Sequence, residues 1–132
     1  MSGKSDLSVV IISPNAPYRS VLVDMLRKQH GIVVEADGAC AEQILKEAPG
    51  LQPSIAFVDG RAIDSVRCLR KAWPNALILC LLDYLSDWES ATGSGADVCV
   101  LKEQGASTII GSITYIIARI RCQAGQAPMN AA

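Results

Sequence analysis

The sequence has few aromatic residues, one histidine and no excess of either charge. Only 5% of its 132 residues are aromatic, so a folded core must be built mainly from aliphatic side chains. The net charge of -1 provides no basic surface for nucleic acid. No apolar run approaches the roughly 20 residues of a membrane helix, which argues against a membrane protein. The single histidine, His30, precedes Gly31 at a predicted helix end, where the helix dipole favours a cation, and we expect no ligand role for it.

The cysteines do not form a metal-binding or disulfide pattern. There are five, at positions 40, 68, 80, 99 and 122, and none forms a Cys-x-x-Cys pair. An odd, scattered set favours reduced thiols in a cytosolic protein. The first residues, MSGKSD, lead straight into a predicted strand without a signal-peptide pattern, so we expect a cytoplasmic protein.

Apolar runs alternate with helical patterns along the chain. Strands are predicted at Leu7 to Ile12, Ile32 to Glu35, Ile55 to Val58, Leu77 to Leu82, and Val98 to Leu101. Helices are predicted from Pro17 to Gly31, from Asp37 or Gly38 to Pro49, from Ile63 to Ala72, from Ser86 to Thr92, and from Ser107 to Arg121. This order predicts an α/β domain over residues 1–122, with a parallel sheet covered by helices on both faces. Residues 123–132 are expected to be a linker or a loose tail.

Four residues follow the carboxyl ends of the predicted strands, where ligands bind in such folds. They are Ser13, Asp59, Leu82 and Lys102. An acidic residue and a lysine at this edge are typical of a phosphoryl-accepting pocket. With no acidic pair nearby, Lys102 is the expected counter-charge of Asp59, and the two are predicted to form an ion pair of modest energy. The alternative is that Asp59 is only a strand-end carboxylate held by Lys102.

Three segments together resemble the receiver domain of bacterial two-component response regulators. They read EADGACAEQILKEAPGLQPSIAFVD, RKAWPNALILCL and GADVCVLKE, and the LuxR-type subgroup is the most similar. The resemblance covers about residues 7–121 and implies a doubly wound, flavodoxin-like fold, also called CheY-like, with strand order 2-1-3-4-5. It also implies that a histidine kinase phosphorylates Asp59, that Lys102 contacts the phosphoryl group, and that phosphate biases a conformational equilibrium.

The sequence departs from this family at the positions that handle phosphate and metal. The acidic pair after the first strand falls on Ser13 and Pro14, although Mg²⁺ prefers carboxylate oxygens. The phosphate-binding hydroxyl falls on Leu82, and the loop after Asp59, GRAID, is short. Asp83 is either a replacement metal ligand or a solvated loop residue. We therefore expect Mg²⁺ binding and Mg²⁺-dependent phosphorylation to be weak or absent.

The last predicted helix carries more isoleucine than one buried stripe requires. Ile109, Ile113, Ile116 and Ile120 share one face, while Ile110, Ile117 and Tyr115 spread beyond it. The excess predicts either a wide buried face or an interface. We expect a homodimer in which Tyr115 or Ile117 lies in the contact. Trp88, in a short helix, is a second candidate for a partner contact.

These observations favour an atypical receiver domain that is not an enzyme. It would regulate a LuxR-type transcription regulator whose DNA contact is made by an effector domain outside this chain, under a histidine kinase or another signalling protein. The alternative is a stand-alone interaction module that binds a partner without phosphotransfer. An enzyme or nucleotide binder is disfavoured, since SPNAP after the first strand contains no glycine for a phosphate loop.

Overall fold

The computed structural model describes residues 7–105, 108–109, 111–116 and 118–119. It divides into two compact units, Met1–Leu101 and Lys102–Ala132. The first unit contains the whole sheet and every described helix before Lys102. Among the described residues, no helix is both long enough and apolar enough to span a membrane.

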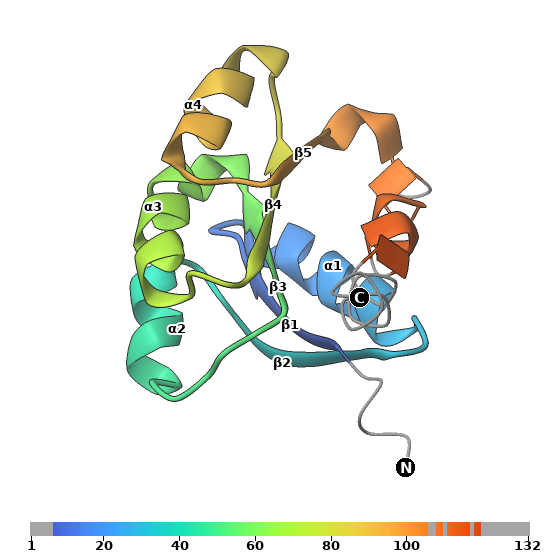
Figure 1. Cartoon of the computed structure of the whole chain (residues 1–132). Helices are drawn as coiled ribbons and strands as arrows, with labels where there is room; N and C mark the ends of the chain where they lie inside the picture. The colour runs from blue at the N-terminus through green and yellow to red at the C-terminus, as the bar shows by residue number, and fades with distance from the viewer. Residues whose placement is uncertain (1–6, 106–107, 110, 117, 120–132) are drawn as a thin grey trace, which may run out of the picture. The chain divides into compact units, whose positions relative to one another are not determined.

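The first unit is built on five parallel strands in the order β2-β1-β3-β4-β5 (Figure 1). The strands are β1 (Leu7–Ile12), β2 (Ile32–Gly38), β3 (Ile55–Asp59), β4 (Leu77–Leu82) and β5 (Val98–Leu101). All four neighbouring pairs are parallel. The predicted fold class and strand order are therefore confirmed.

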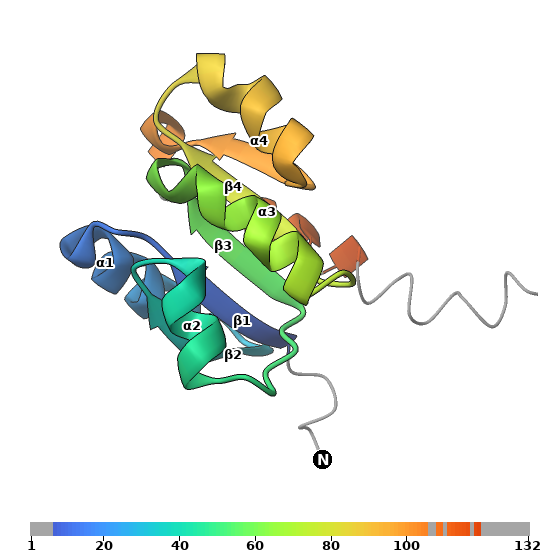
Figure 2. The same cartoon turned by 90° about the vertical axis from the view of Figure 1, so that its left-hand side faces the viewer.

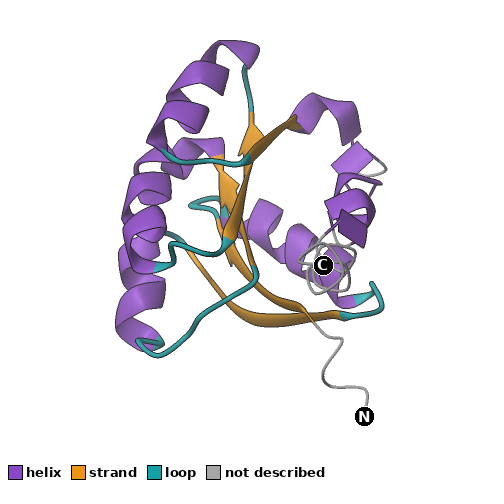
Figure 3. Ribbon diagram, viewed as in Figure 1, coloured by secondary structure: helices purple, strands orange, loops and turns teal. Residues whose placement is uncertain are grey.

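Helices cover both faces of this sheet. They are α1 (Ala16–Arg27), α2 (Ala41–Glu47), α3 (Ile63–Ala72) and α4 (Trp88–Ser94), with short 3-10 turns η2 (Gly60–Ala62) and η3 (Leu85–Asp87). Within this unit, α2, α3 and α4 lie on one side of the strands and α1 on the other (Figure 3). Figure 2 shows α2 and α3 side by side in front of β1, β3 and β4.

The core is aliphatic, as the composition requires. One cluster joins alternate residues of β1, β3 and β4 to the inner faces of α2, α3 and α4. Its central strand members are Val10, Ile12, Ala56, Val58, Ile78, Cys80 and Leu82. Because side chains alternate along a strand, Val9, Ile11 and Phe57 point to the opposite face, and all three are buried. Both faces of the central strands are thus apolar, which explains the continuous apolar runs in the sequence.

The second strand is longer than predicted, and the helix after it begins later. The prediction ended the strand at Glu35 and began the helix at Asp37 or Gly38, whereas β2 runs to Gly38 and α2 begins at Ala41. β2 stays paired with β1 after a register shift at Val9/Val10, so Asp37 and Gly38 remain in the ladder. At Gly38, an added Cβ would lie 3.0 Å from Ile44 Cδ1, so the Ile44 side chain would have to move slightly to accept a larger residue.

The fourth helix is also displaced from its prediction. The segment predicted as helix from Ser86 to Thr92 begins as the turn η3, and α4 continues to Ser94. It ends at Gly95, whose φ of 122° is a conformation that favours glycine. Gly93 therefore lies inside the helix. Of the predicted stop signal Gly93-Ser94-Gly95, only Gly95 ends the helix.

The second unit begins with the turn η4 (Lys102–Gln104), and the described residues from 108 to 119 are helical. Ile109, Ile113 and Ile116 are buried, as their shared face predicted, and Tyr115 is 61% exposed. Ile117, Ile120 and the predicted tail 123–132 lie outside the described residues. The expected boundary of the domain at residue 122 stays a prediction.

Candidate functional site

Ser13 and Asp59 meet at the carboxyl edge of the sheet. Ile12 and Val58 are partners in the parallel pair of β1 and β3, so the next residue of each strand comes to the same place. Ser13 Oγ donates a 2.7 Å hydrogen bond to Asp59 Oδ2. The two residues are 0% and 1% exposed. The site therefore holds a carboxylate that is shielded from solvent and already hydrogen-bonded.

The other oxygen of Asp59 is bound by the loop that follows it. Asp59 Oδ1 accepts a 3.0 Å hydrogen bond from the backbone N–H of Arg61, so Asp59 caps the turn η2. The intervening residue lies against β4, since a Cβ on Gly60 would be 3.1 Å from the Leu81 carbonyl oxygen. Both carboxylate oxygens are thus held, and the glycine lets the loop turn tightly beside β4.

Asp83 lies at the same edge but is engaged with Arg61. The Arg61 Nε to Asp83 Oδ2 distance is 3.3 Å, with the arginine side chain 59% exposed and the aspartate 28%. Arg61 therefore bridges the two aspartates: its backbone binds Asp59 and its side chain binds Asp83. This neutralises Asp83 in part and sets it in an ion pair, unlike the solvated loop residue considered from the sequence.

A second arginine lies on the other side of Ser13. Arg19, from the first turns of α1, donates from Nη1 to the Ser13 carbonyl oxygen at 2.6 Å. Its Nε lies 3.1 Å from Asp37 Oδ2, near the end of β2. A guanidinium thus occupies the start of the β1–α1 loop, beside the residue where a metal-binding carboxylate was expected from the family resemblance. A fixed positive charge there disfavours a divalent cation.

Tyr18 is the aromatic side chain that faces this edge. The pKa of its phenol is raised from 10.0 to about 12, first by burial and then by the negative charges of Asp59 and Asp83. Its backbone N–H is bound by Asn15 Oδ1 at 3.1 Å, which caps α1. Tyr18 therefore brings a neutral phenol, held by the helix cap, close to both carboxylates.

The residues at this edge do not fit a conventional Mg²⁺ site. Pro14 is exposed and has no side-chain oxygen, and Leu82 is fully buried in the apolar core. Within the described ranges, no three His, Cys, Asp or Glu residues come together as a possible metal group. Asp59 and Asp83 are held instead by a hydroxyl, a backbone N–H and a guanidinium.

Lys102 is the predicted site residue that belongs to the second unit. It opens the turn η4 and is half-buried. Asp59 belongs to the first unit and Lys102 to the second, so the predicted contact between these two residues stays a prediction. The same holds for the expected homodimer, because Tyr115 is exposed but Ile117 lies outside the described residues.

The sequence reasoning missed Arg19, Tyr18 and Arg61. A signal for the first two was available, because both follow the Asn15 cap within the opening turn of α1. Side chains in a helix lean toward its N-terminus, and here that end lies at the carboxyl edge of the sheet. Arg61 carried a weaker signal, its position in the short GRAID loop directly after Asp59.

Several solved structures with a similar fold are response-regulator receiver domains. The signal receiver domain of the putative response regulator NarL from Mycobacterium tuberculosis superposes with a TM-score of 0.74 at 16% identity, covering 86% of this chain and 98% of that one. A LuxR-family two-component response regulator from Aurantimonas sp. SI85-9A1 gives 0.73 at 20% identity, covering 86% of each chain. The isolated receiver domain of RcsB from Salmonella enterica serovar Typhimurium, with the phosphomimetic BeF3-, gives 0.66 at 16% identity, covering 78% of this chain and 81% of that one.

The likeness is one of fold. A longer RcsB chain from Salmonella typhimurium, described for its conformational dynamism in DNA interaction, gives a TM-score of 0.71 at 15% identity. The match covers 87% of this chain and 60% of that one. The sequence matches no protein-family model and no curated protein. The chain therefore has the receiver fold, and its function has to be argued from its own site.

Proposed function

We propose that this chain is an atypical response-regulator receiver domain in which conventional Mg²⁺-dependent phosphorylation of Asp59 is weak or absent. It would pass on a signal through conformation, dimerisation or a partner, without itself being an enzyme. The fold supports the receiver assignment, and the altered carboxyl edge supports the departure from the usual chemistry.

The observation that carries the proposal is the double engagement of Asp59. An acceptor carboxylate must present one oxygen to the incoming phosphorus, with a metal neutralising the charge that develops. Here Asp59 is 1% exposed and its two oxygens are bound by Ser13 Oγ and the Arg61 N–H. Phosphorylation would have to break a buried, charge-assisted hydrogen bond before any new contact forms.

The test is to incubate the protein with acetyl phosphate and Mg²⁺, and separately with beryllofluoride and Mg²⁺. We expect no stoichiometric adduct by intact mass and backbone NMR shifts of Asp59 and its neighbours that stay small. Ser13→Asp is the matched variant, since it restores a carboxylate next to the acceptor and should increase any response to Mg²⁺. Stoichiometric modification of Asp59 in the unchanged protein, with shifts spreading across α4, would overturn the proposal.

The finer assignment follows from the LuxR resemblance. We propose a cytoplasmic regulatory module that receives its signal from a histidine kinase or another signalling protein. DNA contact would come from a separate effector domain, because the chain's net charge of -1 provides no basic surface for it. The expected assembly is a homodimer through the last helix.

A specific surface favours the second candidate, a module that binds a partner without phosphotransfer. Tyr84, Leu85 and Trp88, directly after β4, are 69%, 65% and 40% exposed. Between and beside them stand Asp87 and Glu89, and the segment from 83 to 100 contains no basic residue. An exposed apolar group with an acidic rim is suited to an amphipathic, positively charged segment of a partner protein.

This second function can be tested with an amphipathic lysine-rich peptide. Titration should perturb the backbone NMR signals of η3 and the start of α4, and Trp88→Ala should weaken binding by roughly tenfold or more. Val21→Ala is the matched control, because Val21 is 56% exposed on α1, away from this surface. Equal weakening by both variants, or no perturbation at all, would count against the surface.

A further inference from the structure

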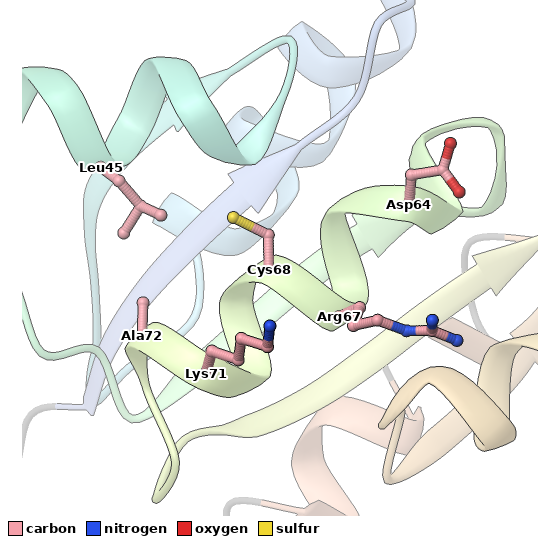
Figure 4. A pocket seen from close by; sticks show the side chains of 6 residues that line it. All are labelled: Leu45, Asp64, Arg67, Cys68, Lys71 and Ala72. Atoms are coloured by element: carbon pink, nitrogen blue, oxygen red, sulfur yellow. The ribbon is translucent and has the colours of Figure 1, made fainter.

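A groove lies between α2 and α3, away from Asp59 and the residues bound to it. One part of it, with a volume of about 560 Å³, has Leu45, Cys68 and Ala72 among its lining residues. Figure 4 shows Cys68 and Ala72 on the side of α3 that faces Leu45 of α2. A neighbouring cavity of about 300 Å³ shares Cys68 and extends to Cys40. The groove therefore brings two cysteines, distant in sequence, to one cavity.

A hydrogen bond between the helices holds the backbone beside these thiols. The N–H of Ala41, the residue after Cys40, donates to Ser65 Oγ at 3.0 Å, and Ser65 is buried. Ser65 and Cys68 are three residues apart on α3, which places them on one face of the helix. The start of α2 is thus pinned to the turn of α3 that carries Cys68.

The cysteines differ in their access to solvent. Cys40 and Cys68 are free thiols and only half-buried. Cys80 and Cys99 lie in β4 and β5 and are buried, and burial raises the pKa of the Cys99 thiol. Oxidation follows exposure and thiolate character, so the pair in the groove is favoured over the pair in the sheet.

We propose that Cys40 and Cys68 form a reversible oxidative modification site, closing a disulfide between α2 and α3. With hydrogen peroxide, one thiolate attacks an oxygen atom and becomes a sulfenic acid as the O–O bond breaks, and the departing hydroxide takes up a proton to form water. The second thiolate then attacks that sulfur and releases a second water. The net change is loss of two hydrogens from the protein, and a thiol reductant reverses it. The bond would fix α2 against α3 and is independent of any chemistry at Asp59.

The experiment treats the full chain with hydrogen peroxide, or with glutathione disulfide, under native conditions at low protein concentration. We expect a product without covalent links between chains, whose chain mass is lower by about 2 Da and is regained on reduction. Trypsin without reductant should yield peptide 29–46, containing Cys40, linked to peptide 68–70, containing Cys68. Cys80 and Cys99 share one tryptic peptide, 72–102, so a disulfide that includes either of them would give a different linked mass.

Variants assign the bond. Cys40→Ser and Cys68→Ser should each abolish the linked peptide, whereas Cys122→Ser should leave it unchanged. Cys80→Ser is a second control within the sheet, and its thermal midpoint shows whether it remains folded. Independent oxidation of the two thiols to sulfinic acids without a link, or a link to Cys122 instead, would overturn the proposal. Neither outcome would bear on Asp59, whose phosphorylation is measured separately.

Discussion

Ser13 Oγ lies 2.7 Å from Asp59 Oδ2, and both residues are closed off from solvent. The contact joins the ends of β3, the central strand of the sheet, and of its neighbour β1. A serine at this position therefore satisfies a buried carboxylate at a place where a second carboxylate would repel it. The serine at this position is thus part of the hydrogen bonding that holds the folded domain together.

Replacing Ser13 by alanine tests this structural role. A hydrogen bond to a charged group contributes roughly 1.5–3 kcal/mol, and Ser13→Ala leaves part of the buried carboxylate unsatisfied. We expect the free energy of unfolding to fall by about 2 kcal/mol, measured by urea denaturation. Ser86→Ala, at an exposed position, should change it by less than ~0.5 kcal/mol. Equal effects would show that the Ser13 hydroxyl does not stabilise Asp59.

Tyr18 predicts a pH dependence in alkaline solution. The pKa of its phenol is raised from 10.0 to about 12 in the folded state, so the fold favours the neutral form. That contribution is complete below the unfolded pKa and is lost as the pH rises from about 10 to about 12. We expect the stability of the unchanged protein to fall more steeply over this window than that of Tyr18→Phe, which keeps the ring but cannot ionise. If urea denaturation shows that the stability of both proteins falls equally over this pH window, the prediction is contradicted.

Gly60 predicts a steric constraint beside Asp59. Its added Cβ would lie 3.1 Å from the Leu81 carbonyl oxygen and 3.1 Å from Leu82 Cδ2, so the loop must shift. We expect Gly60→Ala to destabilise by roughly 1–3 kcal/mol and to move the NMR signal of the Arg61 amide. Gly50→Ala is the matched control, because nothing lies within 4 Å of its added Cβ. If both variants unfold at the same urea concentration, the loop has room that the structure does not show.

The strands, and the sheet edge at which Ser13 and Asp59 meet, could be predicted from the sequence because the signals for the strands are local. Continuous aliphatic runs mark strands buried on both faces, and four of the five runs were placed within one residue of their observed ends. Asp59 and Ser13 were brought together by topology alone, because parallel strands end at one edge.

The rest depended on contacts that no local pattern encodes. Extension of β2 to Gly38 depends on a register shift against β1, and the close approach of α2 depends on the missing side chain there. The ion pair of Arg61 with Asp83 crosses from one loop to another. Arg19 reaches its two acceptors through a long, flexible side chain, whose direction the sequence does not specify.

Arg70 is another long-range contact that the sequence did not reveal. Its guanidinium donates to the carbonyl oxygens of Pro74, Ala76 and Gly95 and lies 2.5 Å from Asp97 Oδ2. Asp97 also accepts from a backbone N–H of β4. This network connects the end of α3 with the loops that lead into β4 and β5.

Removing the Arg70 guanidinium should loosen that end of the unit. Arg70→Met keeps much of the apolar stem but removes the donor to three carbonyl oxygens and to a partly exposed carboxylate, so we expect a loss of about 1–2 kcal/mol in urea denaturation. Arg67→Met, at an exposed position on the same helix, should be nearly neutral. Comparable losses for the two variants would assign the effect to the helix rather than to the network.

The homodimer prediction concerns the last helix. Ile109, Ile113 and Ile116 are buried, while Tyr115 is 61% exposed and holds the Arg119 guanidinium through a 3.0 Å hydrogen bond to its hydroxyl. An exposed aromatic residue beside an isoleucine-rich stretch is suited to a symmetric apolar contact.

We expect light scattering to show a dimer and Ile117→Lys to give a folded monomer, because an ammonium buried in such a contact costs roughly several kcal/mol. Ser90→Lys adds the same charge on exposed α4 and should leave the dimer intact. An unchanged protein that is already monomeric at high concentration would rule the dimer out, and dissociation by Ser90→Lys would place the contact on α4.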